Sequence, residues 1–315
     1  MTLAFALFLA FILGYLAQST GICLVKGVIL ARSKQPFFLI AILLSGTWAW
    51  VALFIADAAD IKHHYQVFTW QSTFIIGGFI FGIGSTINGS CSVGTMNQLA
   101  RGNSNMLFTL CGWALGGIVM LHFNQHWEND FSELSIPYGE PLKPSTLHGI
   151  SLLALSIIAL FWASVSKHKQ TILLITLVGL VSECIFLIEP QWTPSNFTIG
   201  ISYALTFDTI KLPSILRLAI FVFIIIGMMA TAIRSDVFEL QRPKLTTACS
   251  NLLGGLMMGA GGFLAMGGND KQLLIMLPTF SLSSLATLVS MLLGIYIALL
   301  VTGLIKPQHA LKPTI

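Results

Sequence analysis

The sequence predicts an all-α polytopic membrane protein with about nine transmembrane helices in two inverted repeats, each with a broken glycine-rich helix. Composition is the first observation behind this prediction. Only 9% of the 315 residues are charged, 55% are hydrophobic and the mean hydropathy is +0.85. Soluble domains carry about 25% charged residues, so the expected surroundings are a lipid bilayer. The other two observations are a duplicated glycine pattern and the distribution of Lys and Arg.

Nine apolar segments are long enough to span or nearly span a bilayer. They cover residues 1–18, 36–56, 73–90, 106–121, 149–165, 171–188, 214–233, 249–266 and 284–305. The first segment has no basic residues before it, and Gln18-Ser19-Thr20 leads directly into more apolar sequence. We therefore expect a retained span and not a cleaved signal peptide.

Four glycines recur with the same spacing in two of these segments. They are Gly77, Gly78, Gly82 and Gly84 in the first copy and Gly254, Gly255, Gly259 and Gly261 in the second. Duplicated halves with glycine-interrupted spans are typical of transporters whose substrate site lies between the repeats. We expect one membrane domain, with a first repeat at 1–121 (motif 74–103), connecting spans and outer loops at 122–213, and a second repeat at 214–305 (motif 251–280). The alternative is that the glycines serve only close helix packing.

The basic residues predict the orientation. With the amino terminus outside, inner loops hold eleven of the sixteen Lys and Arg residues: Lys26, Arg32, Lys34, Arg101, Lys167, Lys169, Arg234, Arg242, Lys244, Lys306 and Lys312. The outer loops hold most acids, including Glu128, Asp130, Glu133 and Glu140. The two glycine copies then run in opposite directions, so the repeats are inverted. The net charge of +4 is an orientation signal, and no basic face suits nucleic acid.

Each glycine copy is followed by a polar cluster and a short helix. We expect Ser92 to cap a helix over 93–100, and Asn269 to cap one over 270–277 that ends before Pro278. The amino end of such a half-helix presents unpaired N–H groups, which can hold an anion without a fixed cation. The predicted pathway residues are Gly89, Ser90, Cys91, Ser92 and Gly94 in the first copy, and Gly267, Gly268, Asn269 and Asp270 in the second.

These residues resemble a known family. The stretch from Phe79 to Thr95, the later Arg101-Gly102-Asn103 and the second glycine copy are similar to the YeeE/YedE sulfur-transport family, and Gly21-Ile22-Cys23 matches its cysteine site after the first span. The resemblance implies a bacterial inner-membrane protein that imports thiosulfate through a narrow route lined by cysteines. Cys23 and Cys91 would be two of those cysteines. A cytosolic sulfur-carrier or sulfurtransferase protein is the partner that such import would call for.

The second copy departs from the family pattern. Where better-known members carry a second Gly-Gly-Cys, Met266 is followed here by Gly267, Gly268 and Asn269, so Gly268 occupies the cysteine position. Asp270 places a carboxylate at the start of the half-helix, where it competes with an anionic substrate. We expect Lys271 to offset that charge. These differences bear on which sulfur anion passes.

Three roles remain open for Cys91 on sequence grounds. A neutral thiol is a soft contact suited to a sulfur oxyanion, whereas a thiolate would repel a dianion. A position at a helix start instead favours the thiolate and nucleophilic chemistry, such as accepting sulfur as a persulfide. The third role is that of a small residue in a tight turn. Cys111, Cys184 and Cys249 lie in apolar runs without paired spacing, so we expect them to be packing residues.

Glu183 is the other ionisable candidate, because it lies in an otherwise apolar span. Such a residue is a candidate for proton coupling, although the nearby Glu189-Pro190 also allows an interfacial position. The pairs His122/His126 and His63/His64 have metal-like spacing but fall in outer loops, so we expect no metal.

No cofactor or enzymatic function is expected. Gly82-Ile-Gly84 lacks the third glycine of a dinucleotide loop, and no Gly-Lys-Ser/Thr, Gly-x-Ser-x-Gly or Cys-x-x-Cys occurs. Together with the family resemblance, which implies a sulfur-containing solute, the sequence therefore favours transport of a small molecule of that kind. Two alternatives are a membrane sulfur-transfer protein with Cys91 as a persulfide-forming nucleophile, and a non-transporting assembly subunit.

Overall fold

The computed structural model describes residues 2–59, 61, 65–127, 139–142, 145–207 and 212–303. Within these residues the chain is helical apart from one short antiparallel pair of strands, which confirms the predicted fold class. Eight helical segments are long and apolar enough to cross a membrane. A ninth is formed if the bent pair Leu245–Leu264 and Asn269–Thr279 is counted as one span.

The helices of the first half are α1 (Thr2–Thr20), α2 (Leu24–Arg32), α3 (Phe37–Leu44), the 3-10 turn η1 (Ser45–Trp48), α4 (Ala49–Ala58), α5 (Thr73–Asn88), α6 (Ser92–Ala100) and α7 (Met106–Trp127). Those of the second half are α8 (Thr146–Val165), α9 (Lys169–Ile188), α10 (Pro194–Thr206), α11 (Ile215–Arg234), α12 (Leu245–Leu264), α13 (Asn269–Lys271), the π-turn η3 (Gln272–Met276), the 3-10 turn η4 (Leu277–Thr279) and α14 (Leu282–Val301). Strand β1 (Gln66–Phe68) pairs with β2 (Gly139–Pro141).

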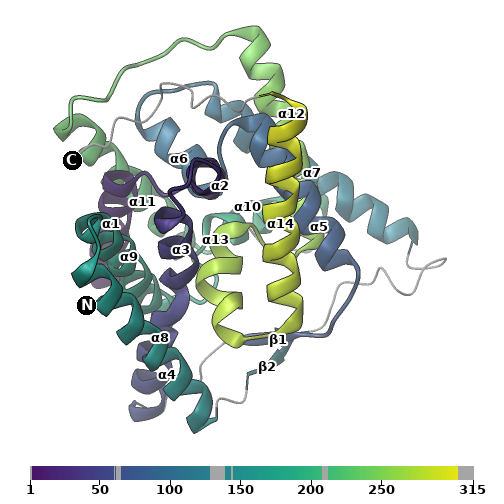
Figure 1. Cartoon of the computed structure of the whole chain (residues 1–315). Coiled ribbons are helices and arrows are strands. Elements are labelled where there is room, and N and C mark those ends of the chain that lie inside the picture. Colours follow the sequence, from purple (N-terminus) through teal and green to yellow (C-terminus); the bar gives the residue numbers. More distant parts are fainter. Residues whose placement is uncertain are drawn as a thin grey trace.

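A long helix followed by a break and a shorter helix occurs four times. The breaks lie at 21–23, 89–91, 189–193 and 265–268, and they lead into α2, α6, α10 and α13. In Figure 1 the labels of these four elements lie between the α1, α3, α9 and α11 group and the α5, α7, α12 and α14 group. The sequence predicted the second and fourth breaks, and the structure adds the other two.

The duplicated glycines bring α5 and α12 together. A Cβ atom built on Gly77 would lie 2.7 Å from the carbonyl oxygen of Gly261, and one on Gly84 would lie 2.7 Å from that of Gly254. The first glycine of one copy thus meets the last glycine of the other. The two helices cross in antiparallel directions, as inverted repeats require.

The remaining motif glycines also serve packing. Gly78 and Gly82 lie against α14, and Gly255 and Gly259 against α7, where an added Cβ would come within 2.0 to 2.6 Å of carbonyl oxygens. All eight glycines therefore allow close backbone approach. They do not interrupt their helices, because α5 and α12 are continuous and the breaks follow them.

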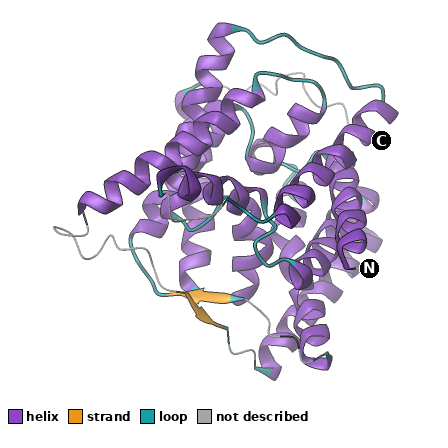
Figure 2. Cartoon of the chain, turned by 180° about the vertical axis from the view of Figure 1, so that it is seen from behind, coloured by secondary structure: helices purple, strands orange, loops and turns teal. Residues whose placement is uncertain are grey.

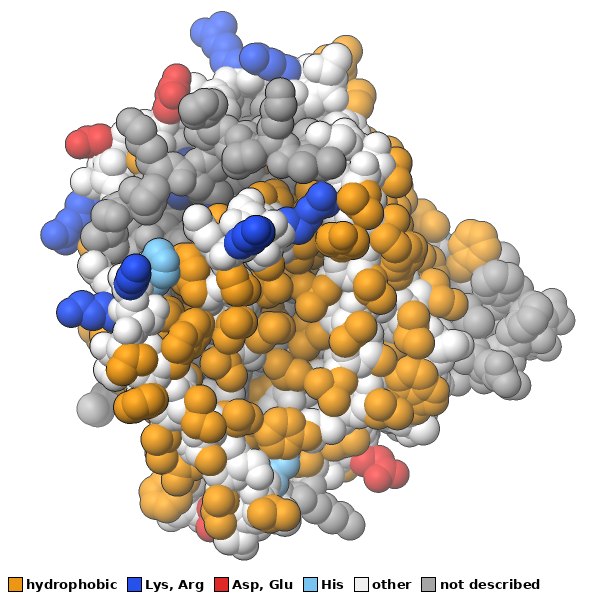
Figure 3. Space-filling view, viewed as in Figure 1, with side chains coloured by type: hydrophobic (Ala, Val, Ile, Leu, Met, Phe, Trp, Pro, Cys, Tyr) orange, Lys and Arg blue, Asp and Glu red, His pale blue; other side chains and the backbone are white. Residues whose placement is uncertain are grey.

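Charge and apolar surface divide the molecule along its long direction. Figures 1 and 2 show the β1–β2 pair at one end and the 235–244 connection at the other. In Figure 3 apolar side chains cover the middle of the face, and most Lys and Arg side chains lie towards the end with that connection. This arrangement suits a protein that spans a bilayer.

Candidate solute pathway

The two predicted cysteines lie side by side where α2 and α6 begin. Cys91 is fully buried, and its Sγ accepts a hydrogen bond of 3.2 Å from the backbone N–H of Leu24. Cys23 is also buried and lies against Gly94 on α6, where an added Cβ would come within 2.9 Å of its Sγ. Each cysteine occupies the residue before its half-helix in extended backbone. The amino ends of two half-helices therefore meet at a pair of thiols.

Ser92 joins this thiol pair to the second repeat. Its backbone N–H and Oγ donate to Oδ1 of Asn269 at 3.2 and 2.7 Å. The expectation that Ser92 and Asn269 cap their own half-helices is wrong. The helices start at these residues, with Cys91 and Gly268 in the cap positions. The reason is that both side chains find better partners across the repeat interface than along their own helices.

Asp270 is held by the amino end of a third half-helix. Its side chain is 2% exposed, Oδ2 accepts from the backbone N–H of Ser195 at 2.9 Å, and Oδ1 accepts from Ser92 Oγ at 3.0 Å. Ser195 lies in the first turn of α10, so the helix dipole stabilises the carboxylate.

Lys271 does not pair with this carboxylate as expected. Its Nζ lies 5.8 Å from the centre of the Phe68 ring, and no ion pair joins it to Asp270 in the described part of the chain. The predicted electrostatic offset acts without direct contact, because the charges of Asp270 and Lys271 interact through space. Backbone and hydroxyl donors make the direct contacts with the carboxylate.

Gly268 stands where the family pattern has a cysteine, and the space for a side chain there is already filled. A Cβ on Gly268 would lie 2.8 Å from Oδ1 of Asp270 and 3.0 Å from the Cβ of Ser195. A side chain at position 268 would therefore compete with the Asp270 carboxylate for the same volume.

Polar residues stabilise the breaks themselves. Gly89 ends α5 with a φ of +76°, and Gly267 has a φ of +150°, so both positions favour glycine. Ser90 is buried, and its hydroxyl accepts a hydrogen bond from the amide of Gln98 on α6. Asn88 donates to the carbonyl oxygen of Ser90 at 2.9 Å. These contacts hold the first break in one conformation.

A polar pocket of about 290 Å³ lies beside Lys271. It is lined by Lys271, Arg217, Glu189, Gln66, Gln191 and Asn196, with Phe68, Phe186 and other apolar residues. The Nε atom of Arg217 lies 3.0 Å from Oε1 of Glu189, and the two side chains form an ion pair. Two cations against one carboxylate make the pocket attractive to anions.

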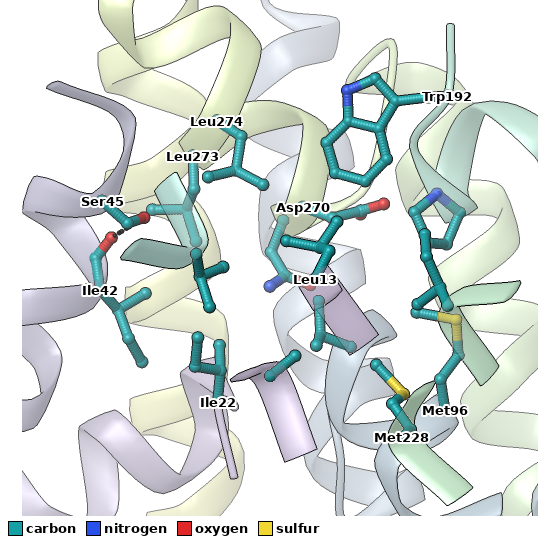
Figure 4. Close-up of a pocket in the computed structure, with 16 residues that line it drawn as sticks. Leu13, Ile22, Ile42, Ser45, Met96, Trp192, Met228, Asp270, Leu273 and Leu274 are labelled. Atoms are coloured by element: carbon teal, nitrogen blue, oxygen red, sulfur yellow. Dashed lines mark hydrogen bonds between the residues drawn. The ribbon is translucent and has the colours of Figure 1, made fainter. Parts of the chain in front are cut away.

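A second cavity, of about 50 Å³, has mainly apolar walls. Figure 4 shows Asp270 at its wall near Trp192 and Leu13, with Met96 and Met228 further along. Among the described residues, the indole Nε1 of Trp192 is buried without a hydrogen-bond partner. Hydrocarbon walls do not suit a divalent anion, and Asn269 and Asp270 are the polar pathway candidates that line this cavity.

The other sequence candidates lie apart from the thiols. Glu183 is 1% exposed and accepts a hydrogen bond from the hydroxyl of Tyr65, so it does not reach the surface. Cys111 and Cys249 are exposed and Cys184 is half-buried. In the part of the chain that is described, no three His, Cys, Asp or Glu side chains gather as metal ligands. His63, His64 and the side chain of His126 lie outside the described residues.

Sequence reasoning missed the third half-helix and its contact with Asp270. Thr193 caps α10 by accepting from the N–H of Asn196, and Pro194 is the first helical residue. A Thr-Pro pair after a long apolar run is a recognisable helix start. That signal identifies α10, but not its contact with a residue 75 positions later.

Comparison with known proteins identifies the family. A family model described as Sulphur transport matches residues 21–173 and again residues 160–297. The chain belongs to this family. It is also 22% identical over 328 aligned residues to the thiosulfate transporter TsuA of Escherichia coli (strain K12), an alignment that covers 91% of each chain. The resemblance drawn from the sequence is confirmed, and the chain is a multi-pass membrane protein of a family that transports sulfur compounds.

Proposed function

We propose that this protein imports a small sulfur-containing anion, thiosulfate or a close relative, through the point where its half-helices meet. One observation carries the proposal: Cys91 is fully buried between the first N–H of α2 and the start of α6, next to the side chains of the second repeat. Helix amino ends attract anions, and thiols offer soft contacts for sulfur. Membership of a sulfur-transport family and the similarity to a thiosulfate transporter support it.

The proposed route has cations on both sides of the thiols. Lys271 and Arg217 attract the anion into the polar pocket. On the other side, Lys26 follows Cys23 by three residues, as Lys271 follows Gly268, and Arg101 follows the last residue of α6. Cations at both ends would favour entry and exit, while the thiols and Ser92 provide the narrow section between them.

We propose that the amino terminus and the polar pocket face outward, and that the carboxyl terminus is cytoplasmic, in the inner membrane of a bacterium. The Lys and Arg residues at the end with the 235–244 connection support this orientation. A cytosolic sulfur-carrier or sulfurtransferase protein would then receive the sulfur.

We also propose that the second repeat begins with α9 and not at residue 214, so that α8 connects the two repeats. Each matched stretch of the family model contains two of the four breaks, and the two stretches overlap at 160–173. On this division α9 and α10 belong to the second repeat, and α8 alone connects the two. The antiparallel contact of α5 with α12 supports an inverted relation.

Uptake of radiolabelled thiosulfate into proteoliposomes tests the proposal. Cys91→Ala should abolish uptake, while Cys249→Ala, which removes an exposed thiol on α12, should leave it at the wild-type level. Equal uptake by wild type and Cys91→Ala would remove Cys91 from the route. A persulfide trapped on Cys91 without any flux would favour sulfur transfer in place of transport.

A further inference from the structure

Glu183 is a buried carboxyl group that the proposed route does not use. It lies on α9 with 1% of its surface exposed. Its Oε2 accepts the Tyr65 hydroxyl, and its Oε1 has no hydrogen-bond partner within the described residues. A bilayer span rarely carries such a group without a function.

No cation lies beside this carboxyl group in the described structure. The elements that pack against α9 are α1, η1, α8, α3, α4 and η3. Their titratable side chains are Tyr15 on α1, Asp57 on α4 and His148 on α8, and none of these bonds to Glu183. On α9 itself the adjacent titratable residue is Cys184. Tyr65 is thus the single hydrogen-bonding partner of Glu183 that the structure describes.

Tyr65 connects Glu183 to the polar pocket. Its ring packs on Phe186 with 4.3 Å between ring centres, and Phe186 and the next residue, Gln66, both line the pocket. Burial, together with the neighbouring Glu183, holds the pKa of Tyr65 well above its usual range, so its hydroxyl remains a proton donor. The Glu183 carboxyl group is therefore linked to the pocket lining through the contact of Tyr65 with Phe186.

We propose that Glu183 and Tyr65 form a proton-binding site that couples solute import to proton entry. This inference rests on the proposed function. A divalent anion entering a cell is opposed by the negative interior potential acting on two charges. One accompanying proton reduces the transferred charge to one. A carboxyl group without a counter-ion in the membrane is suited to binding and releasing that proton.

The simpler alternative is a structural tether between Tyr65 and α9. The substitution Glu183→Gln separates the two roles, because the amide oxygen can still accept from Tyr65 while the side chain can no longer release a proton. A tether would survive this change, and coupling would not.

The test uses proteoliposomes that contain a pH-sensitive dye, with thiosulfate added outside. Wild-type protein should acidify the lumen as it takes up thiosulfate, and an inward proton gradient should accelerate uptake. Glu183→Gln should retain uptake but lose both the acidification and the response to the gradient. Asp57→Asn, which neutralises an exposed carboxylate on α4, is the matched control and should behave as wild type.

Uptake without acidification in wild type would overturn the coupling site, as would full acidification by Glu183→Gln. If wild type takes up no sulfur anion, the proposed function fails. The proton site can then be tested directly by infrared spectroscopy of its carboxyl group. A protonated carboxyl band that titrates in wild type and is missing in Glu183→Gln would support the site. Identical spectra for the two proteins would overturn it.

Discussion

The residue that precedes α6 and the residue that precedes α13 have the same backbone conformation and different chemistry. Cys91 has φ and ψ of −77° and −174°, and Gly268 has −78° and −176°. Any residue can adopt this extended conformation, so the backbone does not require a glycine at 268. Gly268 lacks a side chain because Asp270 and Ser195 occupy the space. The comparison shows that the two repeats share the backbone conformation at this position and not its functional group.

The difference between Cys91 and the Gly268–Asp270 pair changes the electrostatics of one side of the proposed route. The first repeat offers two neutral or ionisable thiols, while the second offers a carboxylate whose charge is balanced by the N–H of Ser195 and the hydroxyl of Ser92. On the proposed route, a divalent anion that passes the thiols also passes this carboxylate. Asp270 is therefore where we expect the selectivity of this protein to be set.

The largest expected effect comes from the close helix packing at the motif glycines. Gly259→Leu should prevent stable folding, since a Cβ there would lie 2.0 Å from the carbonyl oxygen of Trp113. Overpacking a core typically costs about 1–3 kcal/mol, and a backbone clash costs more. Gly149→Leu is the control, because no described atom would lie within 4 Å of a Cβ at that position. Size-exclusion chromatography in detergent would compare them, and a well-folded Gly259→Leu protein would contradict the packing described here.

Restoring the cysteine of the second repeat should reduce transport. Gly268→Cys forces the new side chain against Asp270, so uptake should fall about tenfold, the change that corresponds to roughly 1.4 kcal/mol. Adding Asp270→Ala should recover much of the loss, because it frees the contested volume. Thiosulfate uptake by the two variants provides the comparison. If the effects of the two substitutions on thiosulfate uptake simply add, positions 268 and 270 are not linked.

Removing the carboxylate charge alone should have a smaller effect in the opposite direction. Asp270→Asn keeps the size of the side chain and its acceptor oxygen, and it should raise thiosulfate uptake about threefold by removing repulsion of the dianion. The uptake of a neutral solute should not rise in Asp270→Asn, because the carboxylate does not repel it. A decrease in uptake for Asp270→Asn would mean that the negative charge is needed, for example for a cation that travels with the solute.

The smallest effect is expected in the polar pocket. Lys271→Gln should raise the KM for thiosulfate about two- to threefold with little change in the maximal rate, and raising the salt concentration should reduce the difference. Lys169→Gln, at the start of α9, is a matched lysine outside the pocket. Initial uptake rates at several salt concentrations would measure both. An unchanged KM would show that the pocket does not collect the anion.

The sequence predicted the spans and two of the four breaks because hydropathy and repeated glycines are local signals. The sequence does not predict that a half-helix starts after the break at 21–23, because no glycine run precedes Cys23. The 3-10 turn η1 inside the second span also has no marker in the sequence.

The site was less predictable than the fold. The pairing of Cys91 with Leu24 and of Asp270 with Ser195 depends on contacts between residues 67 and 75 positions apart. Periodicity and capping rules describe neighbours along the chain, and they carry no information on such contacts. The assignment of Ser92 as a local cap failed for this reason, since its partners come from the other repeat.

The central claim is that the solute passes where Ser92 of the first repeat meets Asn269 of the second. The double variant Ser92→Cys/Asn269→Cys places two thiols on side chains that are now in direct contact, with Oγ of Ser92 2.7 Å from Oδ1 of Asn269. Thiosulfate uptake should be measured before oxidation, after a disulfide has formed and after reduction. We expect the disulfide to abolish uptake and reduction to restore it. Unchanged uptake with the disulfide in place would show that the route lies elsewhere.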